Sequence, residues 1–225
     1  DFVCGLADSG CYRPYAHGRI YASDLTMGVT VAPAIQSAWN SHGAEAGAFG
    51  FPVAEAFLVA KGWMQSFRDG IAVLPDGRDA QFVAGPLGLD WLNDGALASP
   101  MGAPTSPQYC VLAANGCVQV FAEGWYYWSP ASGAHYVTGR VLQAWSDRGS
   151  ETGDLGYPLR DTARDSVGGG DWTQFQGGLL YVDRKDRVWA LDPAGAAAYV
   201  DAKSSGNSLG APIAERVCAA GGCTQ

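Results

Sequence analysis

The sequence predicts an α+β fold of four tandem ββα repeats that form one pseudo-symmetric domain over residues 1–225. Three observations predict it. A shift of 106 residues places Cys4 on Cys110 and Trp39 on Trp145, and each half divides again into two units. Every unit opens on an aromatic residue and closes on Gly-x-Pro. Hydrophobic residues make up 48% of the chain, which argues against disorder. Repeats of this length bury their apolar faces against neighbouring repeats.

The four modules cover about residues 15–52, 67–104, 121–158 and 175–212. Each begins with an aromatic residue, has a glycine three positions later and has a second aromatic residue at position twenty-four. We expect these recurring aromatic residues to form the core, because a common fold needs a common filling. They are Tyr15, Phe67, Phe121 and Phe175, together with Trp39, Trp91, Trp145 and Tyr199.

Within a module, the aromatic residue and the following glycine predict a strand, a tight turn and a second strand. Helices are expected at 33–42, 86–94, 139–148 and 194–204. Gly43, Gly95 and Gly149 stand where a left-handed residue would end the first three helices, and Gly206 takes that place in the fourth. Segments of about fourteen to sixteen residues join the modules and are expected to act as linkers.

Both ends of the chain resemble these linkers. A glutamine precedes each internal module (Gln65, Gln119, Gln174), and Gln225 is expected to match them. Two explanations stay open: the array closes into a ring, or the chain ends inside a fifth, truncated repeat. We favour the ring.

Six cysteines occur as three close pairs, Cys4/Cys11, Cys110/Cys117 and Cys218/Cys223. Their proximity favours three local disulfides, and a zinc site is the weaker alternative because no CxxC occurs. We therefore expect no metal. Disulfides are typical of secreted proteins, and the start at Asp1 without a methionine fits a mature exported chain. We expect a secreted protein, either extracellular or associated with a cell wall.

The net charge of −8 and a pI near 4.7 argue against nucleic-acid or anionic-lipid partners, which require a basic face. No apolar run approaches the length that spans a bilayer, so no membrane insertion is expected.

No sequence pattern indicates catalysis. A nucleophile elbow of the Gly-x-Ser-x-Gly type is absent, and no cofactor signature occurs. Asp161, Asp165 and Asp171, and the run from Asp183 to Arg187, are expected to be solvated loop charges. The segment 168–170, three glycines, is expected to be flexible. We expect a protein that is not an enzyme and needs no cofactor.

The third module, from Phe121 through Trp145 to Leu155-Gly156-Tyr157-Pro158, closely resembles the LGFP repeat, a unit of about 54 residues named for its Leu-Gly-Phe-Pro signature. The resemblance is good in the first module (Phe49-Gly50-Phe51-Pro52) and looser in the second and fourth, which have Gly-Ala-Pro. LGFP arrays occur in secreted actinobacterial proteins. The resemblance implies a module that binds cell-wall polysaccharide, with arabinogalactan or a peptidoglycan-linked glycan as the ligand.

Aromatic residues that do not recur between modules are candidates to contact sugar rings. The sharpest group is one hairpin with Trp125, Tyr127, Trp128 and His135, to which we add Trp63 and Trp172. The alternatives are space filling for the tryptophans and a structural role for His135. A second function stays open: a secreted interaction or inhibitor protein whose stapled loops, 105–120 and 159–174, contact an extracellular hydrolase or wall protein.

Overall fold

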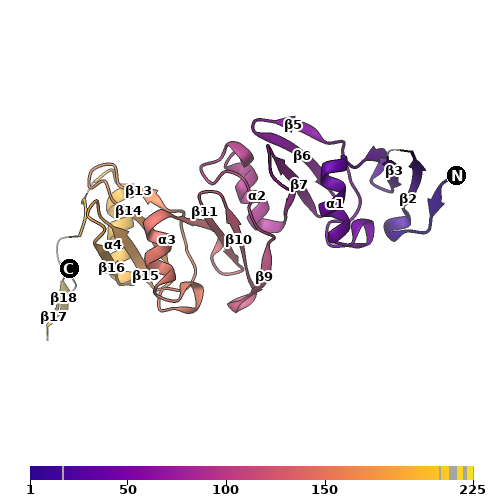
Figure 1. Ribbon diagram of the computed structural model, residues 1–225. Coiled ribbons are helices and arrows are strands. Elements are labelled where there is room, and N and C mark those ends of the chain that lie inside the picture. The colour runs from indigo at the N-terminus through magenta and orange to yellow at the C-terminus, as the bar shows by residue number, and fades with distance from the viewer. Residues whose placement is uncertain (17, 208, 213–216, 220–221, 225) are drawn as a thin grey trace. The chain divides into compact units, whose positions relative to one another are not determined.

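The computed structural model describes residues 1–225 except 17, 208, 213–216, 220–221 and 225, and no side chain from 213 onward is described. Two compact units divide the chain: residues 1–108 with 119–122, and residues 109–118 with 123–225. The fold is α+β, with four small antiparallel sheets each followed by a helix. Figure 1 shows this alternation along the chain. The single domain and ring closure stay predictions.

The first unit contains two modules of four strands and a helix. Its elements are β1 (Val3–Cys4), β2 (Cys11–Tyr15), β3 (Gly18–Ser23), β4 (Thr26–Thr30), α1 (Pro33–Ser41), β5 (Phe57–Val59), β6 (Gly62–Phe67), β7 (Gly70–Pro75), β8 (Gln81–Val83) and α2 (Gly85–Asn93).

The second unit repeats this pattern, and strand β10 contributes residues to both units. Its elements are β9 (Tyr109–Leu112), β10 (Gly116–Phe121), β11 (Gly124–Ser129), β12 (Gly133–Thr138), α3 (Gly139–Ser146), β13 (Ala163–Arg164), β14 (Asp171–Phe175), β15 (Gly178–Val182), β16 (Val188–Leu191), α4 (Pro193–Ser204) and a terminal pair, β17 (Val217–Ala219) and β18 (Gly222–Thr224).

Each module is a ββββα unit, so the predicted ββα unit lacked two strands. The missing strands are the first, which comes from the segment expected to be a linker, and the fourth, which lies inside the module just before the helix. In the first and third modules a disulfide joins the first two strands of the sheet. The predicted helices and their ends are confirmed. Gly43, Gly95 and Gly149 have φ of 88°, 109° and 91°, the left-handed conformation that ends a helix.

In the first and third junctions between modules, one helix lies between two sheets. The Trp39 ring packs edge-on against Tyr21 of its own sheet, with ring centroids 5.0 Å apart, and meets Phe67 of the following sheet at 5.5 Å. Trp145 repeats this contact with Tyr127 at 4.7 Å and Phe175 at 5.2 Å. The core therefore lies between modules as much as within them.

The Gly-x-Pro sequence that closes each of the first three modules pairs with the next sheet. Pro52, Pro104 and Pro158 form isolated antiparallel bridges with Phe67, Phe121 and Phe175. The indole N–H of each preceding helix tryptophan donates to the carbonyl of the glycine in this sequence. The distances are 3.0 Å for Trp39 to Gly50, 2.9 Å for Trp91 to Gly102 and 3.2 Å for Trp145 to Gly156. The fourth helix has Tyr199 instead, and among the described residues its buried hydroxyl finds no partner.

The glutamine that precedes a module joins it to the module before. Gln65 donates to the carbonyls of Thr30 and Ala54 and accepts from the Ala32 N–H. Gln119, also fully buried, donates to the carbonyl of Phe82. Gln174 was a wrong match, because it stands one position later in its strand.

The buried residue in the Gln65 position of the fourth module is Thr173. Its hydroxyl lies 2.8 Å from that of Thr162, which accepts from the Thr138 N–H. A pair of threonines therefore substitutes for one glutamine. Gln225 lies outside the described residues.

Seven of the eight recurring aromatic residues are buried, as predicted, and Tyr15 is not. Phe67, Phe121 and Phe175 are 4%, 2% and 1% exposed because a preceding helix covers each of them, whereas Tyr15 is 52% exposed. Residues 1–16 contain no α-helix that could cover Tyr15.

Two of the three predicted disulfides are confirmed, Cys4–Cys11 and Cys110–Cys117. Cys218 and Cys223 are opposite each other in the β17–β18 ladder, but their side chains lie outside the described residues.

Candidate functional site

The predicted aromatic hairpin exists as β11 and β12, but its residues lie on two faces. Tyr127 is directly opposite His135, and Trp125 stacks on Tyr127 with ring centroids 6.2 Å apart. Trp128 points to the other face of the sheet, because successive side chains in a strand alternate. The structure therefore separates Trp128 from the other three.

Exposure separates the six candidates further. Trp63 and Trp125 are 44% and 37% exposed, and Trp128 and His135 are half-buried. Tyr127 is 2% exposed and belongs to the core around Trp145, so its ring is not available to a ligand. Burial also raises the pKa of the Tyr127 hydroxyl. Trp172 is 8% exposed and packs at a steep angle against Tyr199, so little of its ring is available to a ligand.

A cavity of about 530 Å³ brings His135 and Trp172 together at the junction between the third and fourth modules. The other side chains around it come from the segment after Gly156-Tyr157-Pro158 and from β14. They are Leu159, Arg160, Asp161, Ala163 and Gln174. Donors, acceptors and an aromatic edge therefore surround one cavity, a composition typical of a site for a polar ligand.

Hydrogen bonds hold the polar side chains of this cavity in place. The Asp161 carboxylate lies 3.2 Å from Nδ1 of His135 and accepts the backbone N–H of Tyr136 at 3.1 Å. The Arg160 guanidinium donates to Gln174 at 3.2 Å. Arg160, Asp161 and Gln174 were not predicted as site residues. Asp161 lies in a loop with its side chain 39% exposed, as expected of a solvated loop charge, but it also accepts the Tyr136 N–H and contacts His135.

A signal for Asp161 was present in the repeat. Glu55 stands 106 residues before it and accepts the N–H of Thr30, the equivalent of Tyr136, at 2.8 Å. An acidic residue three positions after Gly-x-Pro therefore has a backbone-capping role in two modules. His135 and Arg160 have no such precedent, because Val29 and Ala54 occupy their positions in the first junction.

Trp63 has a structural role that its sequence did not suggest. It pairs across strands with Leu58, where the first and third modules have their disulfides. In the fourth module the same position has Arg164 opposite Asp171, an ion pair at 3.0 Å. We call this cross-strand pair the clasp of each sheet. The clasp is a disulfide, an apolar pair or an ion pair, depending on the module.

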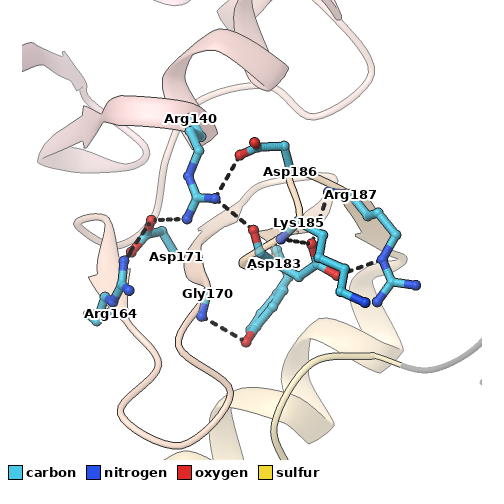
Figure 2. Close-up of polar contacts among 9 residues, drawn as sticks. Arg140, Arg164, Gly170, Asp171, Asp183, Lys185, Asp186 and Arg187 are labelled. Atoms are coloured by element: carbon cyan, nitrogen blue, oxygen red, sulfur yellow. Dashed lines mark hydrogen bonds and ion pairs between the residues drawn. The ribbon is translucent and has the colours of Figure 1, made fainter.

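A network of charges joins α3 to the fourth sheet. Figure 2 shows Arg140 between Asp171 and the turn at Asp183–Arg187: it donates to the Asp171 carboxylate at 2.8 Å, the Asp186 carboxylate at 2.7 Å and the Asp183 carbonyl at 2.7 Å. Burial opposes ionisation of Asp183, but N–H groups and the guanidinium of Arg187 outweigh it and lower its pKa to about 2. The prediction of a solvated turn is therefore wrong for Asp183, which is 4% exposed.

Asp165 is also not a solvated loop charge, because it is fully buried. It forms an ion pair with Lys203 of α4 and accepts the Tyr181 hydroxyl at 2.9 Å. The glycines of 168–170 close over this group: a Cβ on Gly168 would lie 2.3 Å from the Asp165 carboxylate, and one on Gly170 would lie 2.4 Å from the Tyr181 ring. These glycines are needed for close packing, so the expected flexibility does not explain them.

Among the described residues, no group of three or more His, Cys, Asp or Glu side chains is placed to hold a metal ion. In the same part of the chain, no helix is both long and apolar enough to cross a membrane. The two disulfides are compatible with an extracellular location.

Comparison with known proteins identifies the repeat. The LGFP repeat family matches residues 1–47 and 101–153, which contain most of the first and third modules. No curated protein matches the chain. The matched segments contain the two confirmed disulfides and the helix tryptophans Trp39 and Trp145. The chain therefore contains LGFP repeats in its first and third modules.

Proposed function

We propose that this protein is a secreted, non-catalytic module that binds a cell-wall polysaccharide, and that the His135–Asp161 cavity is its principal site. The observation that carries the proposal is the polar lining of that cavity. His135 and Arg160 occupy positions where the first junction has Val29 and Ala54, on an otherwise shared scaffold.

The chemistry of the cavity suits a sugar. Arg160 and Gln174 offer donors and an acceptor for hydroxyl groups, while Leu159, Ala163 and the edge of Trp172 offer apolar surface. Trp125 lies on the His135 face of the β11–β12 hairpin and is 37% exposed, so it can stack on a further ring of a chain. Arabinogalactan and a peptidoglycan-linked glycan are the two ligands that the proposal names.

The buried acids favour a binding role over hydrolysis. Hydrolysis of a glycoside needs two carboxyl groups free to exchange protons or attack. Asp171 is held by Arg140 and Arg164, and Asp165 by Lys203. These groups stabilise the junction.

A pull-down tests the proposal. Protein is incubated with whole actinobacterial wall, wall stripped of arabinogalactan and bare peptidoglycan. We expect retention on whole wall, and we expect Arg160→Ala and His135→Ala each to reduce it by about tenfold, the effect of losing one or two hydrogen bonds to the ligand. Arg78→Ala, an exposed arginine of the first unit, is the matched control.

The pattern across the fractions identifies the ligand. Retention that disappears with the arabinogalactan assigns that polymer, whereas equal retention on bare peptidoglycan assigns the other glycan. If the protein stays in solution with all three fractions, polysaccharide binding is wrong.

A second candidate function is binding to a secreted protein, and one observation favours it. The stapled hairpin within loop 105–120 exposes Tyr109 by 55% and Val111 by 89% on strand β9. Exposed apolar residues on a rigid hairpin are typical of a protein contact. Retention of an extracellular hydrolase or wall protein by the wild type but not by Val111→Asp would support this alternative.

A further inference from the structure

The loop that the Cys110–Cys117 disulfide closes lies on the Gly-x-Pro sequence of the third module. The Tyr157 hydroxyl donates to the Ala113 carbonyl of this loop at 2.6 Å. Gly116 is so close that a Cβ at its position would overlap the same hydroxyl. All of these residues belong to the second unit. The disulfide therefore closes a loop that is in direct contact with Tyr157.

The other modules indicate that the stapled loop and this aromatic residue belong together. In the first module, the Cys4–Cys11 loop makes the same approach, because a Cβ on Gly10 would overlap the Phe51 ring. The second module has a shorter first hairpin without cysteines, and Ala103 takes the place of Tyr157. Among these three modules, the stapled loop and the aromatic residue are thus present together or absent together.

Tyr157 begins the segment that forms one wall of the His135–Asp161 cavity. Its N–H donates to the Gln176 side chain at 3.0 Å, and its carbonyl accepts the Gln176 N–H at 3.0 Å. Two residues later, the Leu159 N–H donates to the Gln174 carbonyl at 2.8 Å. Most of the side chains around the cavity come from the continuation of this segment, residues 159–163.

The far end of the segment is bound to β12. The Thr162 N–H donates to the Tyr136 carbonyl at 3.1 Å, and the Asp161 carboxylate accepts the Tyr136 N–H at 3.1 Å. The cavity wall is therefore held at both ends, by β12 at residues 161–162 and by the stapled loop at Tyr157. A displacement of Tyr157 would move the wall between these two points.

We propose that the Cys110–Cys117 loop positions the wall of the His135–Asp161 cavity for its ligand, and that it acts through Tyr157. The inference rests on the proposed function of this cavity. Tyr157 is a positioning residue, because its side chain is 3% exposed and packs in the core around Trp145 instead of facing the ligand. The disulfide thus has a role in binding besides its role as a clasp.

Two variants interrupt this contact from opposite sides. Tyr157→Phe keeps the ring and removes the hydroxyl, and Cys110→Ala with Cys117→Ala opens the loop. The matched control is Cys4→Ala with Cys11→Ala, which opens a loop of the same length in the first module and leaves the cavity segment untouched.

Two measurements are made on each variant. One is retention on whole actinobacterial wall, and the other is amide hydrogen exchange at Tyr136 and Thr162, which needs no ligand. We expect both test variants to reduce retention about fivefold and to speed exchange at these two amides at least about tenfold. The control should behave like the wild type in both measurements, although it also loses a disulfide.

The combination of both test variants shows whether the loop acts through Tyr157. If it does, adding Tyr157→Phe to the protein with the open 110–117 loop should change retention and exchange by less than about twofold, because the contact is already lost. Circular dichroism establishes that each protein is folded.

Three results would overturn the proposal. Both test variants could match the wild type in exchange at Tyr136 and Thr162. The control could speed this exchange as much as the test variants do, which would make the effect one of general stability. Tyr157→Phe could have its full effect in the protein with the open loop. If no wall fraction retains the wild type, polysaccharide binding is wrong, and the exchange rates alone decide whether the loop positions the cavity.

Discussion

Asp165 has an unusual environment for a carboxylate, because no part of it is exposed. Burial alone would raise the pKa of Asp165, but hydrogen bonds from Lys203 and Tyr181 outweigh that effect and lower it. Burial, together with the neighbouring carboxylate, raises the pKa of the Tyr181 hydroxyl to about 12. The Asp165 carboxylate of this ion pair is therefore protonated only when the pH falls below the ordinary aspartate pKa.

This ion pair predicts a pH dependence of stability. Since the folded pKa of Asp165 is depressed, its contribution is complete above the ordinary aspartate pKa of about 3.9 and is lost as pH falls through the depressed value. Urea midpoints measured from neutral pH downward should decline below about pH 4. Asp165→Asn should lower the free energy of unfolding by about 3–5 kcal/mol, because Lys203 is left unpaired.

Asp165→Asn with Lys203→Met is the control for that experiment. Removing both charges should recover part of the loss and flatten the acid side of the profile. If the urea midpoint of the double variant falls at acid pH as much as that of the wild type, other groups, such as Asp183, cause the loss of stability.

The indole hydrogen bond at each junction is a second residue-level feature. Trp145→Phe keeps a ring between Tyr127 and Phe175 but leaves the Gly156 carbonyl without its donor, and we expect a loss of about 1–3 kcal/mol. Tyr199→Phe is the matched control: its hydroxyl has no partner among the described residues, so removal should cost nothing. Equal losses in chemical denaturation would contradict this assignment.

At the scale of single elements, three different kinds of residue pair occupy the clasp position. The first two strands of each sheet are short, and a cross-strand pair holds them together. The pair is covalent in the first and third modules, apolar at Leu58–Trp63 and ionic at Arg164–Asp171. The position of Trp63 on a narrow hairpin therefore explains its exposure, whether or not Trp63 also contacts a ligand.

The clasp can be exchanged between modules. Leu58→Cys with Trp63→Cys should form a disulfide on oxidation, because the two residues are directly opposite each other, as Cys4 and Cys11 are. We expect oxidation to add about 2 kcal/mol relative to the reduced form of the same variant, measured by thermal unfolding. A free thiol count of two after oxidation would show that the hairpins differ in geometry.

The sequence predicted the elements whose residue types recur from module to module and missed those whose residue types differ. Four helices and their glycine ends were found, because each recurs in register with Trp39, Trp91, Trp145 or Tyr199. The first strand of each sheet was not predicted, because the clasp residues share no chemistry from module to module, and neither was the fourth strand. Of the cavity, His135 and Trp172 were named, whereas Arg160 and Gln174 could not be: only the fold of the junction brings the segment after Pro158 beside β14.

At the scale of the whole molecule, we expect packing at the junctions between modules to contribute more to stability than the disulfides do. Each described disulfide closes a loop of eight residues and contributes about 2–3 kcal/mol at most. Reduction should therefore lower the thermal midpoint and leave the far-ultraviolet circular dichroism at low temperature unchanged. A chain that loses its secondary structure on mild reduction would show that the junction cores alone cannot hold the fold.

The pairing of each Gly-x-Pro sequence with the sheet that follows has a consequence for how such proteins change over evolutionary time. Because the sequence repeat and the packed unit are offset, a duplication or deletion of one repeat length restores a complete junction wherever the break in the gene falls. We therefore expect the number of repeats to change without loss of a junction core.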